Sequence, residues 1–220
     1  MTMNTPGIPK AENISDHEII ARIKAGEKNL YAQVIKKYNQ RLYRIAISIV
    51  NDDAEVEDIM QVTYIRAYEH LGSFAFKANF STWLIRILIN ECLLRLKLKK
   101  RSVHMNDETM DHELYQHKIT EVTTPATKVM NTELKNILEE SIRQLPEKYR
   151  TVFVMREIEG LSVAETQECL DISEANVKVR LSRARVLLKN MLSGFYKKED
   201  ILHFHLTRCD SMVLRVMSKI

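Results

Sequence analysis

The sequence predicts an all-α protein made of two small helical domains joined by a flexible linker. Long parts of the chain repeat apolar residues every three or four positions, the period of a helix with one buried face. Only five Gly and four Pro occur among 220 residues, too few for a turn-rich all-β fold. A polar stretch without helical period, residues 102–131, separates the two periodic parts and is expected to be the linker.

The composition favours a cytoplasmic protein. Hydrophobic residues make up 45% of the chain and the net charge is +4. The N-terminus lacks the apolar core of a signal peptide, and the most apolar run, Trp83 to Ile89, is interrupted by Arg86 and too short to span a bilayer. Three scattered cysteines fit reduced thiols better than a disulfide framework: Cys92, Cys169 and Cys209.

The first domain is expected over residues 15–101, after a flexible arm of residues 1–14. A possible capping box, Ser15 with Glu18, predicts the start of a short helix that ends at Gly26. The next helix should bury a stripe of six apolar side chains: Leu30, Val34, Tyr38, Leu42, Ile45 and Ile49.

A third helix, expected over residues 54–71, begins with a group of acidic side chains. Acidic residues stabilise a helix N-terminus by themselves, and they could also dock on a basic partner. The loop that follows, residues 73–80, is aromatic and polar. Its rings could stack on unpaired bases, although single loop aromatics more often turn into the core.

A fourth helix is expected to run to about Lys99 and to end in a basic cluster. Cations at a helix C-terminus are locally favourable, so a solvated helix end is one interpretation and a phosphate-binding surface is the other. The cations are Arg95, Lys97, Lys99, Lys100 and Arg101.

The second domain is expected over residues 132–193. Helical periodicity resumes through Leu134, Leu138 and Ile142, and Pro146 suits the first position of another helix. Gly160 should end that helix.

The stretch from Leu161 to Leu192 predicts two helices joined by a very short turn. Ser162 and Glu165 form a capping box, and Ser173 is a good N-cap for the second helix. That helix repeats apolar residues on one side: Val177, Leu181, Ala184, Leu188 and Met191. The opposite side carries amide and guanidinium groups, which suit base edges and phosphates. The pattern is typical of a helix-turn-helix, although a helical hairpin with a solvated basic face would look similar.

Residues 194–220 are interpreted as an amphipathic tail that packs on the second domain or on a partner. Asp210 or Ser211 could cap a last helix in it. His203, His205 and Cys209 are possible zinc ligands, but a fourth ligand is not obvious, so we expect neither a metal nor a cofactor.

Two stretches taken together resemble a known family. AEVEDIMQVTYIRAYEHLGSF and NFSTWLIRILIN, followed across the linker by LPEKYRTVFVMREIEGLSVAETQECL and VKVRLSRAR, resemble bacterial RNA polymerase sigma factors of the extracytoplasmic-function group. The resemblance covers nearly the whole chain between Ser15 and Leu192, with both motifs in the order of the family. It implies that the first domain binds core polymerase and the promoter −10 element, and that the second domain reads the −35 element.

The resemblance implies roles for individual residues. The acidic helix would dock on the clamp helices of the polymerase β′ subunit through Asp53, Glu57, Asp58 and Gln61. The loop and the helix after it would open the −10 element and hold a flipped base, through Phe74, Phe76, Asn79, Phe80, Thr82, Trp83, Asn90 and Arg95. Trp83 could instead be a core residue, because large aromatic side chains are usually buried.

The second helix of the helix-turn-helix would read the −35 element. Its implied contacts are Ser173, Glu174, Asn176, Lys178, Arg180, Arg183 and Arg185. The chain departs from the family at two places: Ala75-Phe76 stands where members often have Arg-Gly, and Ala175-Asn176 stands where they often have Gly-Thr. Both departures bear on which bases are preferred.

We therefore expect a sigma factor that directs promoter recognition, melting and transcription initiation. Its expected partners are core polymerase, promoter DNA and an anti-sigma factor, without a small-molecule substrate and without enzymatic activity. An alternative is a helix-turn-helix regulator with a helical sensor domain, which would have no use for the acidic docking helix. A second alternative is a metal-linked redox sensor that uses the tail residues His203, His205 and Cys209.

Overall fold

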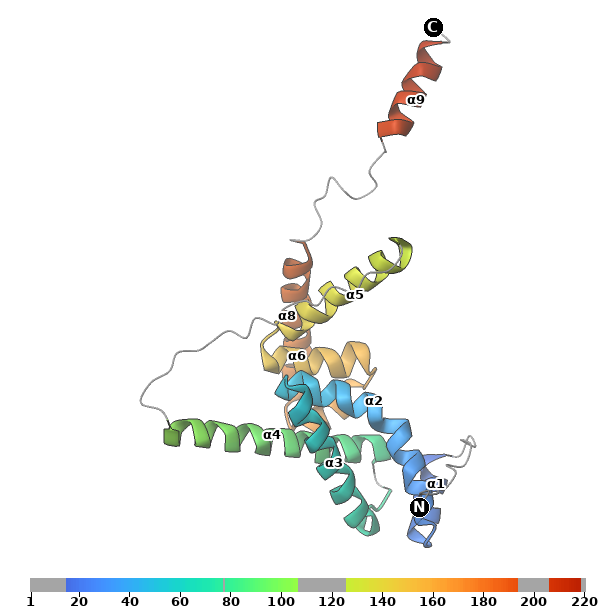
Figure 1. The fold of residues 1–220 in the computed structure, drawn as a ribbon. Coiled ribbons are helices and arrows are strands. Elements are labelled where there is room, and N and C mark those ends of the chain that lie inside the picture. Colours follow the sequence, from blue (N-terminus) through green and yellow to red (C-terminus); the bar gives the residue numbers. More distant parts are fainter. Residues whose placement is uncertain (1–14, 77, 107–125, 194–205, 219–220) are drawn as a thin grey trace, which may run out of the picture.

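The computed structural model describes residues 15–76, 78–106, 126–193 and 206–218, and all regular elements in those ranges are helical. The helices form two bundles that lie against each other, with a final helix set apart from both (Figure 1). The first bundle contains α1 (Asp16–Lys24), η1 (Lys28–Leu30), α2 (Tyr31–Val50), α3 (Asp53–Glu69), η2 (Leu71–Ser73) and α4 (Phe80–Asn106). The second bundle contains α5 (Ala126–Arg143), α6 (Glu147–Phe153), the π-helical turn η3 (Val154–Ile158), α7 (Val163–Leu170) and α8 (Glu174–Ser193), and the separate helix is α9 (Leu206–Met217).

Local signals set the helix ends of the first bundle. The Ser15 hydroxyl accepts a hydrogen bond from the Glu18 backbone N–H at 3.2 Å, which caps α1. Asn51 adopts a left-handed conformation, φ 58°, and ends α2. The Asp52 carboxylate then accepts from the Glu55 N–H at 3.2 Å and starts α3.

The core of the first bundle lies between α2, α3 and α4, which pack on one another in pairs. Leu84, Ile85 and Leu88 on α4 are completely buried there. The six predicted stripe residues are all buried, with Leu30 on η1 and the other five on α2. The bundle thus follows from helices with one apolar face each.

The second bundle has two small cores on either side of α6. One contains Leu145, Ala184 and Leu188, and the other contains Val152 and Val177 with Leu181. The stripe predicted for α8 is therefore buried, with Met191 packed at its edge. The two cores hold α8 against α6 and against α5.

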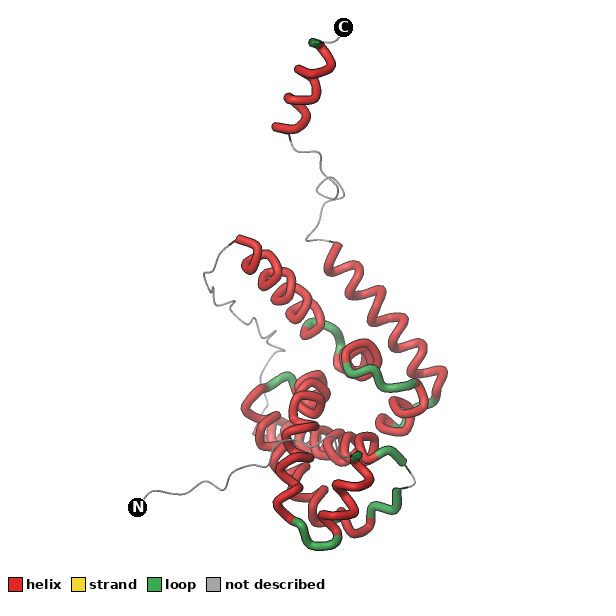
Figure 2. Tube along the Cα trace, turned by 90° about the vertical axis from the view of Figure 1, so that its right-hand side faces the viewer, coloured by secondary structure: helices red, strands yellow, loops and turns green. Residues whose placement is uncertain are grey.

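The two bundles lie against each other (Figure 2). Their contact is made by α7 packed on α4 and by α6 packed on α2. Met155, Leu161 and Cys169 of the second bundle belong to the apolar core of the first bundle. Their exposed fractions are 0%, 5% and 6%. The sequence did not predict this shared core.

Several predicted helix ends differ from the observed ones. α4 continues to Asn106 and α5 already begins at Ala126, so both ends of the expected linker are helical. Pro146 is the N-cap of α6 and not its first residue. α9 begins at Leu206, so neither Asp210 nor Ser211 caps it.

Two apolar positions of the predicted α5 pattern, Leu134 and Leu138, are exposed. Only the C-terminal part of that stripe packs, through Ile142 against the α8 side of the bundle. The apolar side chains described on α9, from Met212 to Met217, are also exposed, and in Figure 1 the helix lies away from both bundles. The expected packing of the tail on the second domain is therefore not found for them.

Candidate protein and nucleic-acid interfaces

A surface groove of about 600 Å³ runs between α2 and α3 beside the acidic residues. Its polar wall includes Glu57 and Gln61, two residues predicted to bind core polymerase, and both are exposed. Its apolar lining, which the sequence analysis missed, comes from Ile35, Tyr43, Met60, Tyr64 and Ile65. Ile65 is 59% exposed, so a large part of its apolar side chain faces solvent.

Tyrosine hydroxyls hold the walls of this groove in place. Tyr64 donates to the Ile35 carbonyl oxygen at 3.2 Å, and Tyr31 donates to the Tyr64 carbonyl oxygen at 2.6 Å. Burial raises the pKa of Tyr31 and of Tyr64 above the ordinary range of tyrosine, so both stay neutral donors. Ile35 and Tyr43 on α2 are large apolar or aromatic residues outside the buried stripe, and they were the sequence signal that could have indicated this site.

The other two predicted polymerase contacts lie outside the groove lining. Asp58 is exposed on α3. Asp53 accepts a hydrogen bond from Tyr43 and lies 4.0 Å from Arg143 of the second bundle. Asp53 is therefore already engaged by two neighbours, whereas Asp58 is presented to solvent.

The predicted −10 loop is built around a cluster of aromatic rings in tilted and edge-to-face contact. Phe74 lies 5.5 Å from Phe80 and 5.2 Å from Trp83 between ring centroids, and Phe80 lies 5.5 Å from Trp83. Lys24 donates to the Phe74 carbonyl oxygen at 2.6 Å and fixes the loop to α1. Phe76 projects at the edge, with 37% of its surface exposed.

Burial divides the predicted −10 set into two groups. Phe74, Phe80 and Thr82 are at most 5% exposed, and in this conformation they support the loop. Buried aromatic rings stabilise a fold strongly, and the sequence of a loop does not show which of its rings will be buried. The exposed members of the set are Phe76, Asn79 and Asn90, while Trp83 and Arg95 are half-buried.

The predicted recognition helix is α8, and its start is capped as expected. The Asn176 backbone N–H donates to the Ser173 hydroxyl at 3.2 Å. The capping box of α7 is complete: the Glu165 N–H donates to the Ser162 hydroxyl at 3.1 Å, and the Ser162 N–H donates to the Glu165 carboxylate at 2.8 Å. Asp171, at φ 51°, makes the turn between the two helices.

The cations of α8 are oriented by partners in the second bundle. Arg180 donates to the Asn176 side chain at 2.9 Å, and Lys178 pairs with Glu174 at 2.6 Å. Two further arginines reach α6 and η3. Those contacts join Arg183 to the Tyr149 hydroxyl at 3.2 Å and Arg185 to Glu157 at 2.6 Å.

The contact with Arg183 lowers the pKa of Tyr149, because the donated hydrogen bond favours the phenolate. Of the predicted −35 residues, Ser173, Glu174, Lys178, Arg183 and Arg185 are exposed, and Asn176 and Arg180 are half-buried. All seven lie on α8 or at its N-cap, so the structure brings them together as predicted.

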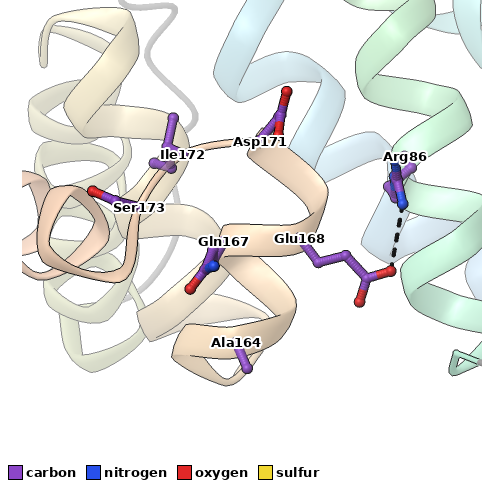
Figure 3. A pocket seen from close by; sticks show the side chains of 7 residues that line it. All are labelled: Arg86, Ala164, Gln167, Glu168, Asp171, Ile172 and Ser173. Carbon is purple, nitrogen blue, oxygen red and sulfur yellow. Dashed lines mark hydrogen bonds and ion pairs between the residues drawn. The ribbon is translucent and has the colours of Figure 1, made fainter.

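An open cleft of about 550 Å³ lies where α4 meets the helix-turn-helix (Figure 3). Arg86 of α4 reaches across it to Glu168 of α7, at 3.5 Å. The turn residues Asp171 and Ile172 and the cap Ser173 line its other side. Sequence reasoning missed this site, because it is formed by segments that are far apart in the chain.

Among the residues that the structure describes, no group of three or more His, Cys, Asp and Glu side chains could hold a metal ion. His203 and His205 lie outside the described residues, as does the side chain of Cys209. None of the helices in the described ranges is long and apolar enough to span a membrane.

Comparison with known proteins assigns the two bundles to two family descriptions. Residues 34–102 match "Sigma-70 region 2" and residues 135–188 match "Sigma-70, region 4". The fold is similar to that of the sigma factor RpoE from Bartonella quintana, solved with the anti-sigma factor NepR, at a TM-score of 0.59 and 21% identity, covering 74% of this chain and 96% of that one. CnrH, solved with the cytosolic domain of CnrY, gives a TM-score of 0.54 at 22% identity over 81% and 97% of the chains.

Curated relatives match along nearly their whole length. "RNA polymerase sigma-H factor" of Pseudomonas aeruginosa is 29% identical over 186 residues, covering 83% of this chain and 96% of the relative. "ECF RNA polymerase sigma factor SigW" of Bacillus subtilis is 34% identical over 176 residues, covering 79% of this chain and 94% of the relative. The chain therefore belongs to the extracytoplasmic-function RNA polymerase sigma factors and serves promoter recognition and transcription initiation.

Proposed function

We propose that this sigma factor docks on the clamp helices of core RNA polymerase through the groove between α2 and α3. The observation that carries the proposal is the exposed apolar lining of the groove, with Ile65 at its edge and Glu57 and Gln61 beside it. An apolar centre with a charged rim is the common anatomy of a protein interface. The acidic rim would complement a basic helical partner and steer its approach.

Competition for core polymerase tests this proposal. The purified protein is mixed with fluorescently labelled core RNA polymerase, and the housekeeping sigma factor is added as a competitor. Binding that the competitor displaces supports a shared clamp site. A folded protein that fails to bind contradicts the proposal and favours the alternative of a helix-turn-helix regulator acting alone.

Two substitutions localise the interface. Asp58→Lys reverses a charge on α3 and should weaken core binding by about tenfold or more, because close charge pairs at interfaces are worth more than 1.4 kcal/mol. Ile65→Ser removes apolar surface that is already exposed, so it should weaken binding without destabilising the fold. The matched control is Glu69→Lys, at an exposed position near the other end of the same helix. Normal core affinity of both groove variants would refute the docking role.

For promoter contacts, we propose that Phe76, Asn79 and Asn90, with Trp83 and Arg95, face the −10 element, and that α8 enters the major groove of the −35 element. The exposure of Phe76, Asn79 and Asn90 supports the first assignment, and Trp83 and Arg95 are half-buried beside them. The gathering of amide and guanidinium groups on α8 supports the second. The domains would then be residues 15–101 and 132–193, with residues 102–131 connecting them along the polymerase.

We further propose that the chain works in the cytoplasm without enzymatic activity or cofactor of its own, and that an anti-sigma factor holds it inactive. The similar fold of RpoE from Bartonella quintana was solved with the anti-sigma factor NepR, which supports the last point. The exposed apolar side chains of α9 offer such an inhibitor a surface. Deletion of residues 195–220 should weaken inhibitor binding and leave core binding intact. Unchanged inhibitor binding would remove α9 from this role.

A further inference from the structure

The outward face of α8 has an apolar centre. Val177, Leu181 and Ala184 bury the inward face, at exposed fractions of 0%, 9% and 0%. At about 100° per residue, Val179 and Val186 lie directly opposite these three side chains. Val179 is 49% exposed and Val186 is 55% exposed, so both present methyl groups to solvent. The amide and guanidinium groups expected on this face therefore lie beside an apolar centre.

The cations next to Val179 are held by neighbours on the same helix. Lys178 pairs with Glu174 at 2.6 Å, and Arg180 donates to the Asn176 side chain at 2.9 Å. Val179 itself packs in none of the hydrophobic clusters that the described residues form. Its methyl groups are therefore available to a partner, while the cations on either side are already held in position.

Small side chains surround Val179 on the outward face. Ala175 lies about one turn before it and Ser182 about one turn after it, and both are exposed. Neither side chain is long enough to hold the helix away from a surface, so the backbone of α8 can approach a partner closely at Val179. The N-terminal residues of the second helix are the ones that contact base edges in a helix-turn-helix. Val179 lies in the second turn of α8, whereas Val186 lies two turns further on, about 10 Å along the axis at 1.5 Å per residue.

A valine at such a position has a specific counterpart among the bases. The apolar group that a base presents in the major groove is the C5-methyl group of thymine. Cytosine lacks this methyl group and presents an amino donor, for which valine offers no acceptor. Valine is branched at Cβ and has one strongly preferred rotamer in a helix, so its methyl groups are fixed before DNA binds. Val179 is therefore suited to favour thymine over cytosine without a hydrogen bond.

We propose that Val179 reads a thymine of the −35 element by contact with its C5-methyl group. The proposal rests on the proposed entry of α8 into the major groove, and it adds the base and the side chain that selects it. Lys178 and Arg180 would hold the helix on the DNA on either side of this contact. Removal of one methyl group from water between Val179 and the base corresponds to about a fourfold gain in affinity.

Removal of the thymine methyl group tests the contact. Holoenzyme assembled from the full chain and core polymerase first selects promoter duplexes from a library randomised in the −10 and −35 segments, and an enriched duplex serves as the probe. Deoxyuridine, which differs from thymidine only by the missing C5-methyl group, then replaces each thymine of the −35 segment in turn. Fluorescence anisotropy gives the Kd of holoenzyme for each duplex. We expect one replacement to weaken wild-type binding about fourfold.

Two valine substitutions assign this effect to a side chain. Val179→Ala should weaken binding to the thymine duplex by a similar factor, and it should show no further loss on the deoxyuridine duplex. Val186→Ala removes the same atoms from the same face two turns away, so it should behave like wild type on both duplexes. Both valines are about half exposed, so neither substitution opens a cavity in the core. Urea unfolding followed by circular dichroism checks that both variants are as stable as wild type.

Three results would overturn the proposal. They are an enriched −35 segment without thymine, deoxyuridine replacements that leave wild-type affinity unchanged at every position, and a methyl effect that persists in Val179→Ala. Each of them leaves the proposed function standing, because the holoenzyme has still selected a −35 sequence. If holoenzyme forms and no −35 sequence is enriched, α8 does not read this element, and the proposed function fails together with the role of Val179.

Discussion

Phe76 adopts a left-handed backbone conformation, φ 57°, which is costly for a residue with a Cβ atom. Its ring lies 4.9 Å from Phe74 and 4.3 Å from His17 between centroids, and Lys24 Nζ lies 5.0 Å from the ring centre. These ring contacts hold Phe76 in place despite its left-handed backbone. This placement keeps an aromatic ring exposed at the edge of the proposed −10 site.

Two substitutions of Phe76 test whether its left-handed backbone is strained. Phe76→Ala and Phe76→Gly both remove the ring, but only glycine relieves the left-handed backbone. We expect Phe76→Gly to be more stable than Phe76→Ala by about 1 kcal/mol in urea unfolding. Ala75→Gly, at a neighbouring position without positive φ, should instead destabilise the protein. Equal stability of the two Phe76 variants would show that the loop relaxes around this residue.

Glu165 gives a prediction about pH. The hydrogen bond from the Ser162 backbone N–H lowers the pKa of Glu165 below its ordinary 4.5, and the contacts with the Ser162 side chain and Asn79 act in the same direction. A carboxyl with a depressed folded-state pKa stabilises the fold above its unfolded pKa, and this stability is lost as the pH falls through the folded value. Glu165→Gln should therefore cost about 1 kcal/mol at pH 7.

Urea unfolding of wild type and Glu165→Gln between pH 7 and pH 3 checks this prediction. The difference in unfolding free energy should shrink once the pH drops below 4.5, because protonated Glu165 resembles the amide. Glu69→Gln, at an exposed position, controls for general charge effects. A difference that stays constant with pH would mean that ionised Glu165 is not what caps α7.

Helix starts and stripes were predictable residue by residue, because the interactions that set them are local. Ser162 reaches Glu165 within one turn, and Ser173 reaches Asn176 in the same way. Burial of Phe74 was one of two expectations for the aromatic loop, and the sequence could not decide between them because the covering atoms come from other helices. The residue types of Phe74 and Thr82 suited both DNA contact and core packing, and the structure shows both residues buried.

At the scale of the element, α8 combines a buried stripe with oriented cations. Val177 and Leu181 fix the helix in the second bundle, and Arg180 extends on its other side to Asn176 at 2.9 Å. A side chain held by a neighbour loses less freedom when it binds, which favours its use in base reading. The hydrogen-bond donors of α8 are therefore held in position before DNA binds.

Arg180→Ala tests base reading by α8. If Arg180 reads a base, holoenzyme binding to a cognate −35 element should weaken by about 1–3 kcal/mol, with little change on a substituted element. If it contacts only phosphate, the loss should be similar on every sequence and the dependence on salt should become shallower. Fluorescence anisotropy at several salt concentrations separates these outcomes. Lys189→Ala, at an exposed position near the end of α8, is the control.

The ends of α4 and α5 show where element prediction failed. Residues up to Asn106 and from Ala126 are helical, although the polar sequence lacks an apolar period there. A helix that projects beyond its bundle needs no buried stripe, so periodicity gives no signal. Leu134 and Leu138 show the converse, since their periodic spacing predicted packing and they remain exposed.

For the whole molecule, two clearly separated sequence motifs fold into bundles that share one apolar core. Met155 was predicted as part of a second-domain helix, yet it fills the first bundle. Arg41 and Arg44 showed no sign of a partner in sequence, because Glu159 lies more than a hundred positions away. Contacts between residues so far apart in the sequence form only in the complete fold, so the local sequence pattern does not predict them.

Arg150 connects the bundles through backbone carbonyls and allows a test of their coupling. Its buried guanidinium donates to the Ser48 carbonyl oxygen at 2.6 Å, at the end of α2, and to the Arg143 carbonyl oxygen at 2.5 Å, at the end of α5. Burial lowers its pKa from the ordinary value, and the helix ends supply compensating partial negative charge. Arg150→Met keeps the aliphatic length and removes these donors. We expect it to cost about 2–3 kcal/mol in unfolding free energy.

Trp83 fluorescence reports whether the loss of stability in Arg150→Met also affects the first bundle. Trp83 is the single tryptophan and belongs to the first bundle, whereas Arg150 belongs to the second. Because the carbonyl of Ser48 and the shared core join the two, the urea midpoint seen by Trp83 should fall in Arg150→Met. Lys148→Met removes an exposed cation from the same helix and should shift that midpoint by less than about 0.5 kcal/mol equivalent. If Arg150→Met loses helical circular dichroism at lower urea while Trp83 unfolds at the wild-type midpoint, the bundles unfold independently and their shared core contributes little to the stability of the first.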